Sequence, residues 1–225
     1  MNIKYQILNE VLIEWSDSSK EDSENTFLQS EDIKSGLDKC FIYRVENENR
    51  PIHIFYGDRD IVYPWEDFKK YRNKVWINGK QVELNDKGYT VDIFEPGEYE
   101  VYIEGINKAV NTNSIFYKCE QLVSVYNLNI PSIGICCFAG CRNLKDVVIS
   151  NFVTRIGPQG FWGCRKIENI TIPNSVTEIG NNAFRNCINL KTVYVEDINK
   201  FKQIRFEGEA VDPTCYGAKV VELKK

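Results

Sequence analysis

The sequence predicts a mainly β protein, in which a β-rich amino-terminal region precedes a short solenoid with a parallel strand ladder. The first observation behind this prediction is a fixed repeat, because four cysteines follow one another at intervals of 22, 23 and 23 residues: Cys119, Cys141, Cys164 and Cys187. A period of about 20 to 29 residues is typical of solenoids whose coils each add one short strand. The second observation is a series of short β-rich runs between turn signals, which ends near residue 104.

Several independent columns of residues support the repeat. A Phe stands three residues before each Cys, a Leu or Ile stands three residues after it, and a Gly stands four residues before the last three Phe. The columns are Phe116, Phe138, Phe161 and Phe184; Leu122, Leu144, Ile167 and Leu190; Gly134, Gly157 and Gly180. We expect the first two columns and the cysteines to face the interior, where burial of one Phe stabilises by about 1.5 to 3 kcal/mol.

Within each coil the pattern predicts a strand, a bend and a turn. Segments 144–149, 167–172 and 190–195 carry β-branched residues at strand spacing, and we expect these strands to stack in parallel. The Gly marks a sharp bend, after which a segment such as "AFRNC" crosses the back of the coil as a short helical turn. Each coil then leaves an apolar face that only its neighbours can cover.

The aligned coils carry a family resemblance. They read "IPSIGICCFAGCRNLKDVVI", "NFVTRIGPQGFWGCRKIENITI" and "IPNSVTEIGNNAFRNCINLKTVYV", after a partial coil in "NTNSIFYKCEQLVSVYNLN". This pattern closely resembles the BspA-like leucine-rich repeats, also called the Treponema pallidum class, which occur in gut and oral bacteria and their phages. The resemblance covers about residues 98 to 220 and implies a right-handed leucine-rich-repeat solenoid. We therefore expect three regions: residues 1–72, β-rich and of no family that we can assign; residues 73–110, a β-meander that caps the solenoid; and residues 111–225, the repeats with a C-terminal cap.

The amino-terminal half reads as short strands joined by turns. Residues 1–15 alternate as one strand or a tight pair, and the runs 39–46 and 51–56 predict a hairpin. Residues 64–73 predict a short helix with Pro64 near its first turn. Residues 74–104 predict a four-stranded meander around an Asn78-Gly79 turn, and its last strand, 99–103, leads into the first coil. Because an open solenoid end exposes apolar rings and strand edges, we expect the meander to cover it.

Charge is unevenly distributed along the chain. Residues 1–110 carry 14 basic and 22 acidic side chains and residues 111–225 carry 14 and 10, so the two balances are −8 and +4. Residues 16–32 hold six acids against one Lys and predict a surface loop, with an acidic docking segment as the alternative. The basic residues after residue 111 are scattered singly, which argues against a nucleic-acid partner.

The sequence also bears on the compartment. No apolar run of about 18 residues could span a bilayer, and the first residues alternate instead of forming a signal peptide. We therefore expect a cytoplasmic location by default, although proteins of the resembled family are often exposed on the cell surface.

The residue types that carry chemistry elsewhere have structural explanations here. His53 is the single histidine and alternates with Ile52 and Ile54 on a predicted strand, so a base-dependent nucleophile is not expected. The cysteines include no Cys-x-x-Cys pair, and those of the repeat are expected to be buried thiols. Cys137 fills a small inward slot and Cys136 is expected at the surface, which argues against a zinc site with Cys141.

Two further patterns are also set aside. The acidic group Asp58, Asp60, Glu66 and Asp67 matches no calcium loop. The glycines at 157, 160 and 163 do not have the spacing of a phosphate-binding loop. We therefore expect no catalytic residue, no cofactor, no metal ion and no enzyme activity, with an enzyme in residues 1–72 as the alternative.

The outward positions of the predicted strands vary from coil to coil, while the inward ones repeat. A surface whose shape is fixed while its residues vary is suited to recognition by an extended face, although exposure to solvent alone would also explain the variation. We predict partner binding at Lys145, Asp146, Glu168, Asn169, Lys191, Thr192, Tyr194 and Tyr126. Trp162, next to the inward Phe161, is a second candidate: it either anchors a partner on the convex surface or packs on the next coil.

Together these observations favour a non-catalytic binding protein that recognises another protein, with a glycan as the alternative ligand. The resembled family includes bacterial surface adhesins that bind host matrix proteins, which points to host or surface recognition. The alternative from another class is a structural or assembly subunit of a larger complex or virion.

Overall fold

The computed structural model describes residues 3–8, 11–16, 40–45, 52–55, 75–84, 90–91, 95–104, 106, 112–128, 130–208 and 213–223. The chain divides into two compact units, Met1–Asp38 and Lys39–Lys225. In the first unit, β1 (Ile3–Leu8) pairs antiparallel with β2 (Val11–Ser16), which confirms the predicted tight pair. The predicted acidic loop, from residue 17 onwards, the predicted helix 64–73 and the acidic group around Asp58 lie outside the described residues.

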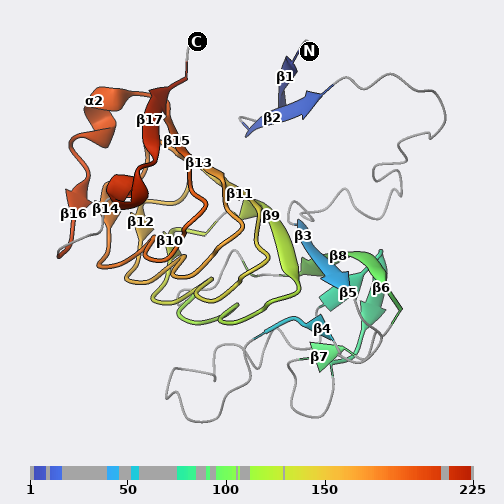
Figure 1. The fold of residues 1–225 in the computed structure, drawn as a ribbon. Helices are drawn as coiled ribbons and strands as arrows, with labels where there is room; N and C mark the ends of the chain where they lie inside the picture. Colours follow the sequence, from blue (N-terminus) through green and yellow to red (C-terminus); the bar gives the residue numbers. More distant parts are fainter. Residues whose placement is uncertain are drawn as a thin grey trace. The chain divides into compact units, whose positions relative to one another are not determined.

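The second unit contains a β-solenoid with two ladders of parallel strands, as Figure 1 shows. One ladder consists of the strands that end each coil: β9 (Leu122–Leu128), β11 (Asp146–Ile149), β13 (Asn169–Ile172), β15 (Thr192–Val195) and β17 (Lys219–Glu222). The other consists of two-residue strands: β10 (Ser132–Ile133), β12 (Arg155–Ile156), β14 (Glu178–Ile179) and β16 (Arg205–Phe206). The predicted parallel ladder is confirmed, and the second ladder was not predicted.

The repeat columns form the interior of the solenoid. The rings of Phe116, Phe138, Phe161 and Phe184 stack with centroids 5.2, 5.3 and 5.4 Å apart and interplanar angles of at most 12°. Offset or stacked rings at this spacing attract one another in addition to the area that they bury. The predicted stack of inward rings is therefore confirmed, and it runs through every coil of the repeat.

The repeat cysteines form a second column beside the rings. Each thiol donates a hydrogen bond to the carbonyl of the Phe in the preceding coil, with Sγ to O distances of 2.9 Å for Cys141, 3.1 Å for Cys164 and 3.1 Å for Cys187. All of these thiols are fully buried and free. Cys recurs because a thiol is small and apolar and can still donate to a Phe carbonyl, which already accepts the backbone N–H of the Cys in its own coil.

The glycines of the repeat are explained by close packing between coils. A Cβ at Gly180 would lie 2.4 Å from the Pro158 nitrogen, and one at Gly157 would lie 2.9 Å from the Gly134 carbonyl carbon. These glycines stand directly before the turn of each coil but do not adopt the left-handed backbone, which occurs elsewhere in the coil. It falls on two periodic columns: Ser114, Cys136, Gln159 and Asn182; Lys118, Gly140, Gly163 and Asn186.

Strands from residues 40–103 continue the ladder on the amino-terminal side of the first coil. They are β3 (Cys40–Val45), β5 (Val75–Ile77), β6 (Lys80–Val82) and β8 (Gly97–Ile103), and the sheet order is β11-β9-β3-β8-β5-β6. The predicted hairpin of residues 39–46 and 51–56 is wrong, because β3 pairs with β8 and β9 while β4 (Ile52–His53) pairs with β7 (Thr90–Val91). The four-stranded meander is likewise wrong in its pairing, although the Asn78-Gly79 turn joins β5 to β6 as predicted, with both residues at positive φ.

A short segment after β4 takes the place of a preceding coil. The ring of Phe55 stacks on Phe116 at 6.3 Å, and the Ile54 carbonyl accepts hydrogen bonds from the Tyr43 hydroxyl at 3.0 Å and the Cys119 thiol at 3.8 Å. Phe55 therefore extends the ring column, and Ile54 supplies the carbonyl that the thiol column needs at its first member.

The last coil ends in a different way. Helix α2 (Ile198–Phe201) is capped by Asp197, whose carboxylate accepts from the backbone of Asn199 and Lys200, and it buries Phe201. A 3-10 helix (Pro213–Tyr216) then leads into β17, which pairs in parallel with β15. Thus the chain adds one more strand to the ladder after the last repeat.

Candidate functional site

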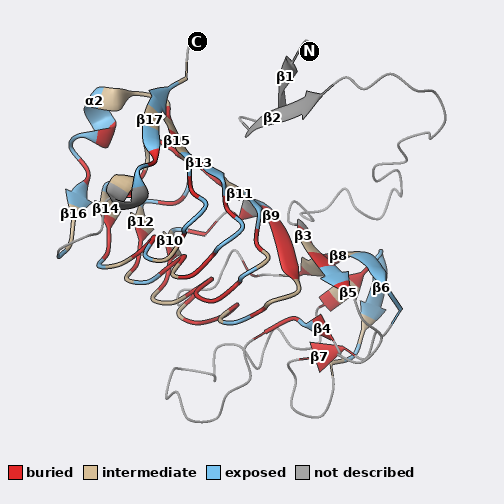
Figure 2. Ribbon diagram, in the orientation of Figure 1, coloured by how far each residue is buried: buried red, intermediate tan, exposed pale blue. Residues whose placement is uncertain are grey.

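The strand face is the outer surface formed by β9, β11, β13, β15 and β17. Side chains alternate across these strands, so that Ile170 and Ile172 are buried while Asn169 is exposed and Thr171 is half-buried. Figure 2 shows the same ladder turning from buried at β9 to exposed at β17. The face is therefore accessible over its later coils.

The structure brings the predicted binding residues together on this face. Lys145, Asp146, Glu168, Asn169 and Lys191 are exposed, Thr192 and Tyr194 are half-buried, and Tyr126 is 38% exposed. In register, Asp146 lies beside Ser124, Asn169 beside Thr192, and Thr171 beside Tyr194. The observed register thus matches the predicted columns between β9 and β11 and between β13 and β15.

An apolar column runs across the middle of the strand face. Its members are Tyr126, Val148, Thr171, Tyr194 and Val221, of which Val221 is 40% exposed. Val221 and its neighbour Lys219 were missed from the sequence, because β17 follows Thr192 by 27 residues and lacks the Cys and Leu of the repeat. The signal that could have found them is the β-branched pair in "AKVVEL", which aligns with "KTVYVE" of the preceding strand.

Charged residues flank the apolar column. The Lys191 ammonium lies 2.8 Å from the Glu168 carboxylate and holds the pKa of that carboxyl below its usual value by donating a hydrogen bond to it. The Asp146 carboxylate accepts from the Ser124 hydroxyl at 3.3 Å. The acids of the face thus already have partners within the protein.

The first coil departs from the predicted pattern. Val123 and Ser124, expected to face outward, are only 8% and 4% exposed. Their strand, β9, is an interior strand of the six-stranded sheet and lies between β3 and β11. The accessible part of the strand face therefore begins at Tyr126 and Lys145.

Two residues of the back turns lie deeper than expected. Trp162, the candidate convex anchor, is half-buried. Cys136, expected at the surface, is also half-buried; its thiol lies 3.2 Å from the Gln159 amide oxygen, and burial raises its pKa. Neither side chain stands clear of the surface as an anchor or a reactive thiol would.

The chemistry that other sites could support is limited. His53 is exposed on β4 between the buried Ile52 and Ile54, as its alternation predicts. Within the described ranges, no three His, Cys, Asp or Glu side chains gather in a way that could hold a metal ion. Among the same residues, no helix is both long and apolar enough to cross a membrane.

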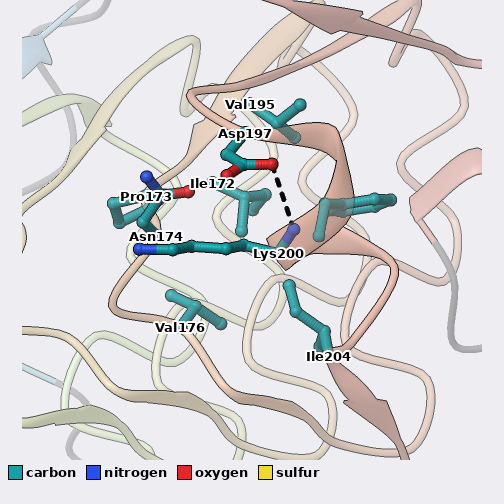
Figure 3. A pocket seen from close by; sticks show the side chains of 9 residues that line it. Ile172, Pro173, Asn174, Val176, Val195, Asp197, Lys200 and Ile204 are labelled. Atoms are coloured by element: carbon teal, nitrogen blue, oxygen red, sulfur yellow. Dashed lines mark hydrogen bonds between the residues drawn. The ribbon is translucent and has the colours of Figure 1, made fainter.

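A recess lies where β13 and β15 end and α2 begins (Figure 3). It is lined by apolar side chains together with the caps of the helix, among them Ile172, Pro173, Asp197 and Lys200. Its volume is about 10 Å³, which is room for one water molecule. Organic ligands need pockets of about 300 to 1,000 Å³, so this recess is not a ligand site.

Comparisons with known proteins agree with the repeat structure. Residues 111–218 match the BspA type leucine rich repeat region in six copies. A leucine rich cell surface protein from Faecalibacterium prausnitzii is similar at 36% identity over 33% of this chain and 20% of its own, with a TM-score of 0.33. The T. pallidum leucine rich repeat protein is similar at 21% identity over 43% of this chain and 60% of its own, with a TM-score of 0.30. This chain thus spans less than two thirds of either protein, and no curated protein matches it.

Proposed function

Because residues 111–218 match the BspA type leucine rich repeat region, we propose that the strand face binds a protein partner and that the chain has no catalytic role. The observation that carries this proposal is the contrast between the two sides of one ladder. The inward residues repeat from coil to coil, whereas the outward residues of β11, β13 and β15 differ in charge, size and polarity. Such a surface keeps its shape while its composition is free to match a partner.

The chemistry of the face supports a macromolecular partner. Tyr126 and Val221 are exposed apolar residues at the two ends of a column that Val148, Thr171 and Tyr194 connect. Aromatic residues are enriched in protein interfaces, and an exposed apolar row bordered by charges is the usual arrangement of an interface core and its polar surround. A flat ladder offers no enclosure for a small molecule, which needs a concave site.

The test compares two variants of the full chain. In the first, Lys145, Glu168, Lys191 and Tyr194 on the strand face are changed to Ala. In the matched control, Lys118 and Arg185, which are exposed on the back turns, are changed to Ala. Each protein captures partners from an extract of its source organism, and mass spectrometry identifies them.

We expect the strand-face variant to lose a partner that the wild-type and control proteins retain, and purified partner to rebind only the latter two. The melting temperature of both variants should stay close to that of the wild-type protein, because exposed side chains contribute little to stability. Equal capture by all three proteins would contradict recognition by this face. Loss of self-association as the only difference would instead favour a structural or assembly subunit.

A further inference from the structure

The strand face is interrupted between β11 and β13. At the start of the other strands a backbone N–H donates to the preceding coil, from Lys145 to Val123, from Lys191 to Glu168 and from Lys219 to Lys191, each at 2.8 Å. No matching bond joins the Glu168 N–H to the Lys145 carbonyl among the described residues, and the two strands belong to different sheets. The second ladder stays continuous across the same coils, from β10 to β16. The interruption is therefore confined to the strand face.

One substitution in the repeat coincides with this break. In the turn before β11 the Asn143 amide donates to the Glu120 carbonyl at 2.9 Å, and in the turn before β15 the Asn189 amide donates to the Arg165 carbonyl at 2.6 Å. The intervening coil has Lys166 at this position, which cannot supply the amide that binds one coil to the previous one. A cation thus stands where the repeat otherwise uses a structural link.

Three cations lie around the break, and one of them, Lys145, is close enough to Glu168 to help lower the pKa of its carboxyl. Lys145, Arg165 and Lys166 are exposed, and none of them forms an ion pair with another described residue. The nearby acids are engaged elsewhere: Glu168 with Lys191 at 2.8 Å, Glu120 with Arg142 at 3.6 Å, and Asp146 with Ser124 at 3.3 Å. This part of the face therefore carries more positive than negative charge, and an acidic partner would complement it.

The apolar column indicates the shape of a partner segment that could supply the negative charge. It crosses five strands, which at about 4.8 Å each span about 19 Å, the length of about six residues of extended chain. A single extended segment of this length, laid along the column, would contact all of its members. Lys145 precedes Val148 by three residues and Lys166 precedes Thr171 by five, so residues of the segment outside this span reach the cations.

We propose that Lys145, Arg165 and Lys166 bind carboxylates of an extended acidic segment of a protein partner, whose apolar side chains lie along Val148, Thr171 and Tyr194. This inference rests on the proposed function, since it names the chemistry of the partner that the strand face binds. Electrostatic complementarity of this kind sets specificity and the rate of association more than the final affinity.

The experiment selects binders from a phage-displayed library of random peptides of about ten residues, a length that exceeds the span of the column. The bait is the full chain. We expect the selected peptides to be enriched in Asp and Glu alternating with aromatic or β-branched residues, and their binding to weaken as salt rises.

Three variants then separate the contributions. The charge reversal K145E/K166E should lower the affinity of the selected peptides by about tenfold or more, whereas the matched reversal K118E/R185E on the back turns should change it by less than about twofold. Tyr194→Ser should weaken binding without changing its salt dependence. Circular dichroism of each variant checks that the fold is kept.

Each result decides between the two proposals. Selected peptides that are not acidic, that lose affinity with Tyr194→Ser and that ignore K145E/K166E would overturn the acidic partner and leave the strand face as the binding site. Binding that is insensitive to all strand-face variants would overturn both. If a single-stranded oligonucleotide or heparin binds the wild-type chain more tightly than the selected peptides, through the same lysines, the partner is a different polyanion and the inference fails.

Discussion

The two outer faces of the solenoid are built by the same coils and yet carry different kinds of surface. On the second ladder, β12, β14 and β16 place Arg155, Glu178 and Arg205 side by side. Glu178 contacts Arg155 at 2.5 Å and Arg205 at 3.1 Å, and Glu207 contacts Arg205 at 3.0 Å. On the strand face, Lys145, Arg165 and Lys166 form no such pair with any described residue. The second ladder thus pairs these charges with one another, whereas on the strand face Lys191 pairs with Glu168 and three other cations form no ion pair with a described residue.

The interior between the faces explains how they can diverge. The stacked rings and the thiol hydrogen bonds repeat in every coil and fix the position of each strand. The outward residues of a strand can therefore differ without moving it. Packing at this density tolerates little change, whereas the outward side chains contact few neighbours. The predictions below test this division, beginning with the residue on which the coils depend most.

The largest effect is expected from the middle of the ring column. Phe161→Ala removes a fully buried ring that stacks on both Phe138 and Phe184, and should lower the free energy of unfolding by about 3 to 5 kcal/mol. The control is Phe152→Ala, the same change at a ring that is 66% exposed, which should cost less than about 0.5 kcal/mol. Urea denaturation measures both. Similar losses of unfolding free energy in the two variants would contradict the conclusion that the buried rings stabilise the fold more than exposed ones.

A glycine of the repeat comes next. Gly180→Ala would place a Cβ 2.4 Å from the Pro158 nitrogen, so that neighbouring coils must move apart. We expect the free energy of unfolding to fall by an amount at the upper end of about 1 to 3 kcal/mol, as for other overpacked sites. The control is Gly97→Ala, where the nearest atoms lie 3.6 Å away and belong to a Tyr side chain. Thermal melts that rank the two glycines in the opposite order would show that coil spacing does not require Gly180.

Much of this interior could be predicted from the sequence, because residues that face the core must recur wherever coils stack. The columns of Phe, Cys and Leu, the strand positions and the alternation at His53 are all consequences of that requirement. The outward columns followed as well, since the strand period fixes which residues point away from the core.

The remaining features depend on contacts that a local pattern does not contain. The place of β3 between β8 and β9 joins segments more than 50 residues apart, and nothing in "CFIYRV" distinguishes those neighbours from β4. The second ladder escaped prediction because strands of two residues have no measurable alternation. The break at Lys166 became visible only when the Asn143 and Asn189 amides were seen to link successive coils.

The thiol column predicts a dependence on alkaline pH. Burial raises the pKa of Cys187 to about 12, whereas a thiol in the unfolded chain titrates near about 8.5. Because the folded pKa is the higher one, the stabilising contribution is complete below about pH 8.5 and is lost as the pH rises toward 12, at about 1.4 kcal/mol per pH unit. The free energy of unfolding should therefore fall by about 2 kcal/mol more in the wild-type chain than in Cys187→Ala between pH 7 and pH 10.

Denaturation midpoints over this range, with Cys136→Ala as the half-buried control, separate the thiol from the tyrosines and lysines that also titrate. A slope that is the same in the wild-type chain and in Cys187→Ala would show that this thiol is accessible to base, and would remove it from the interior column.

The smallest expected effect compares the two outer faces directly. Arg155 donates a hydrogen bond to the Glu178 carboxylate and is the main cause that lowers the pKa of this group, so Glu178 stabilises the fold above its unfolded pKa, near about 4.3, and loses this contribution as the pH falls through its folded value. Glu178→Gln should therefore cost up to about 1 kcal/mol at pH 7, with the difference from the wild-type chain disappearing in acid. Glu168→Gln breaks the exposed pair with Lys191 on the strand face and should have a smaller effect at pH 7. If Glu168→Gln instead destabilised the chain as much as Glu178→Gln, the charges of the strand face would be structural too, and the reason to look for an acidic partner there would be lost.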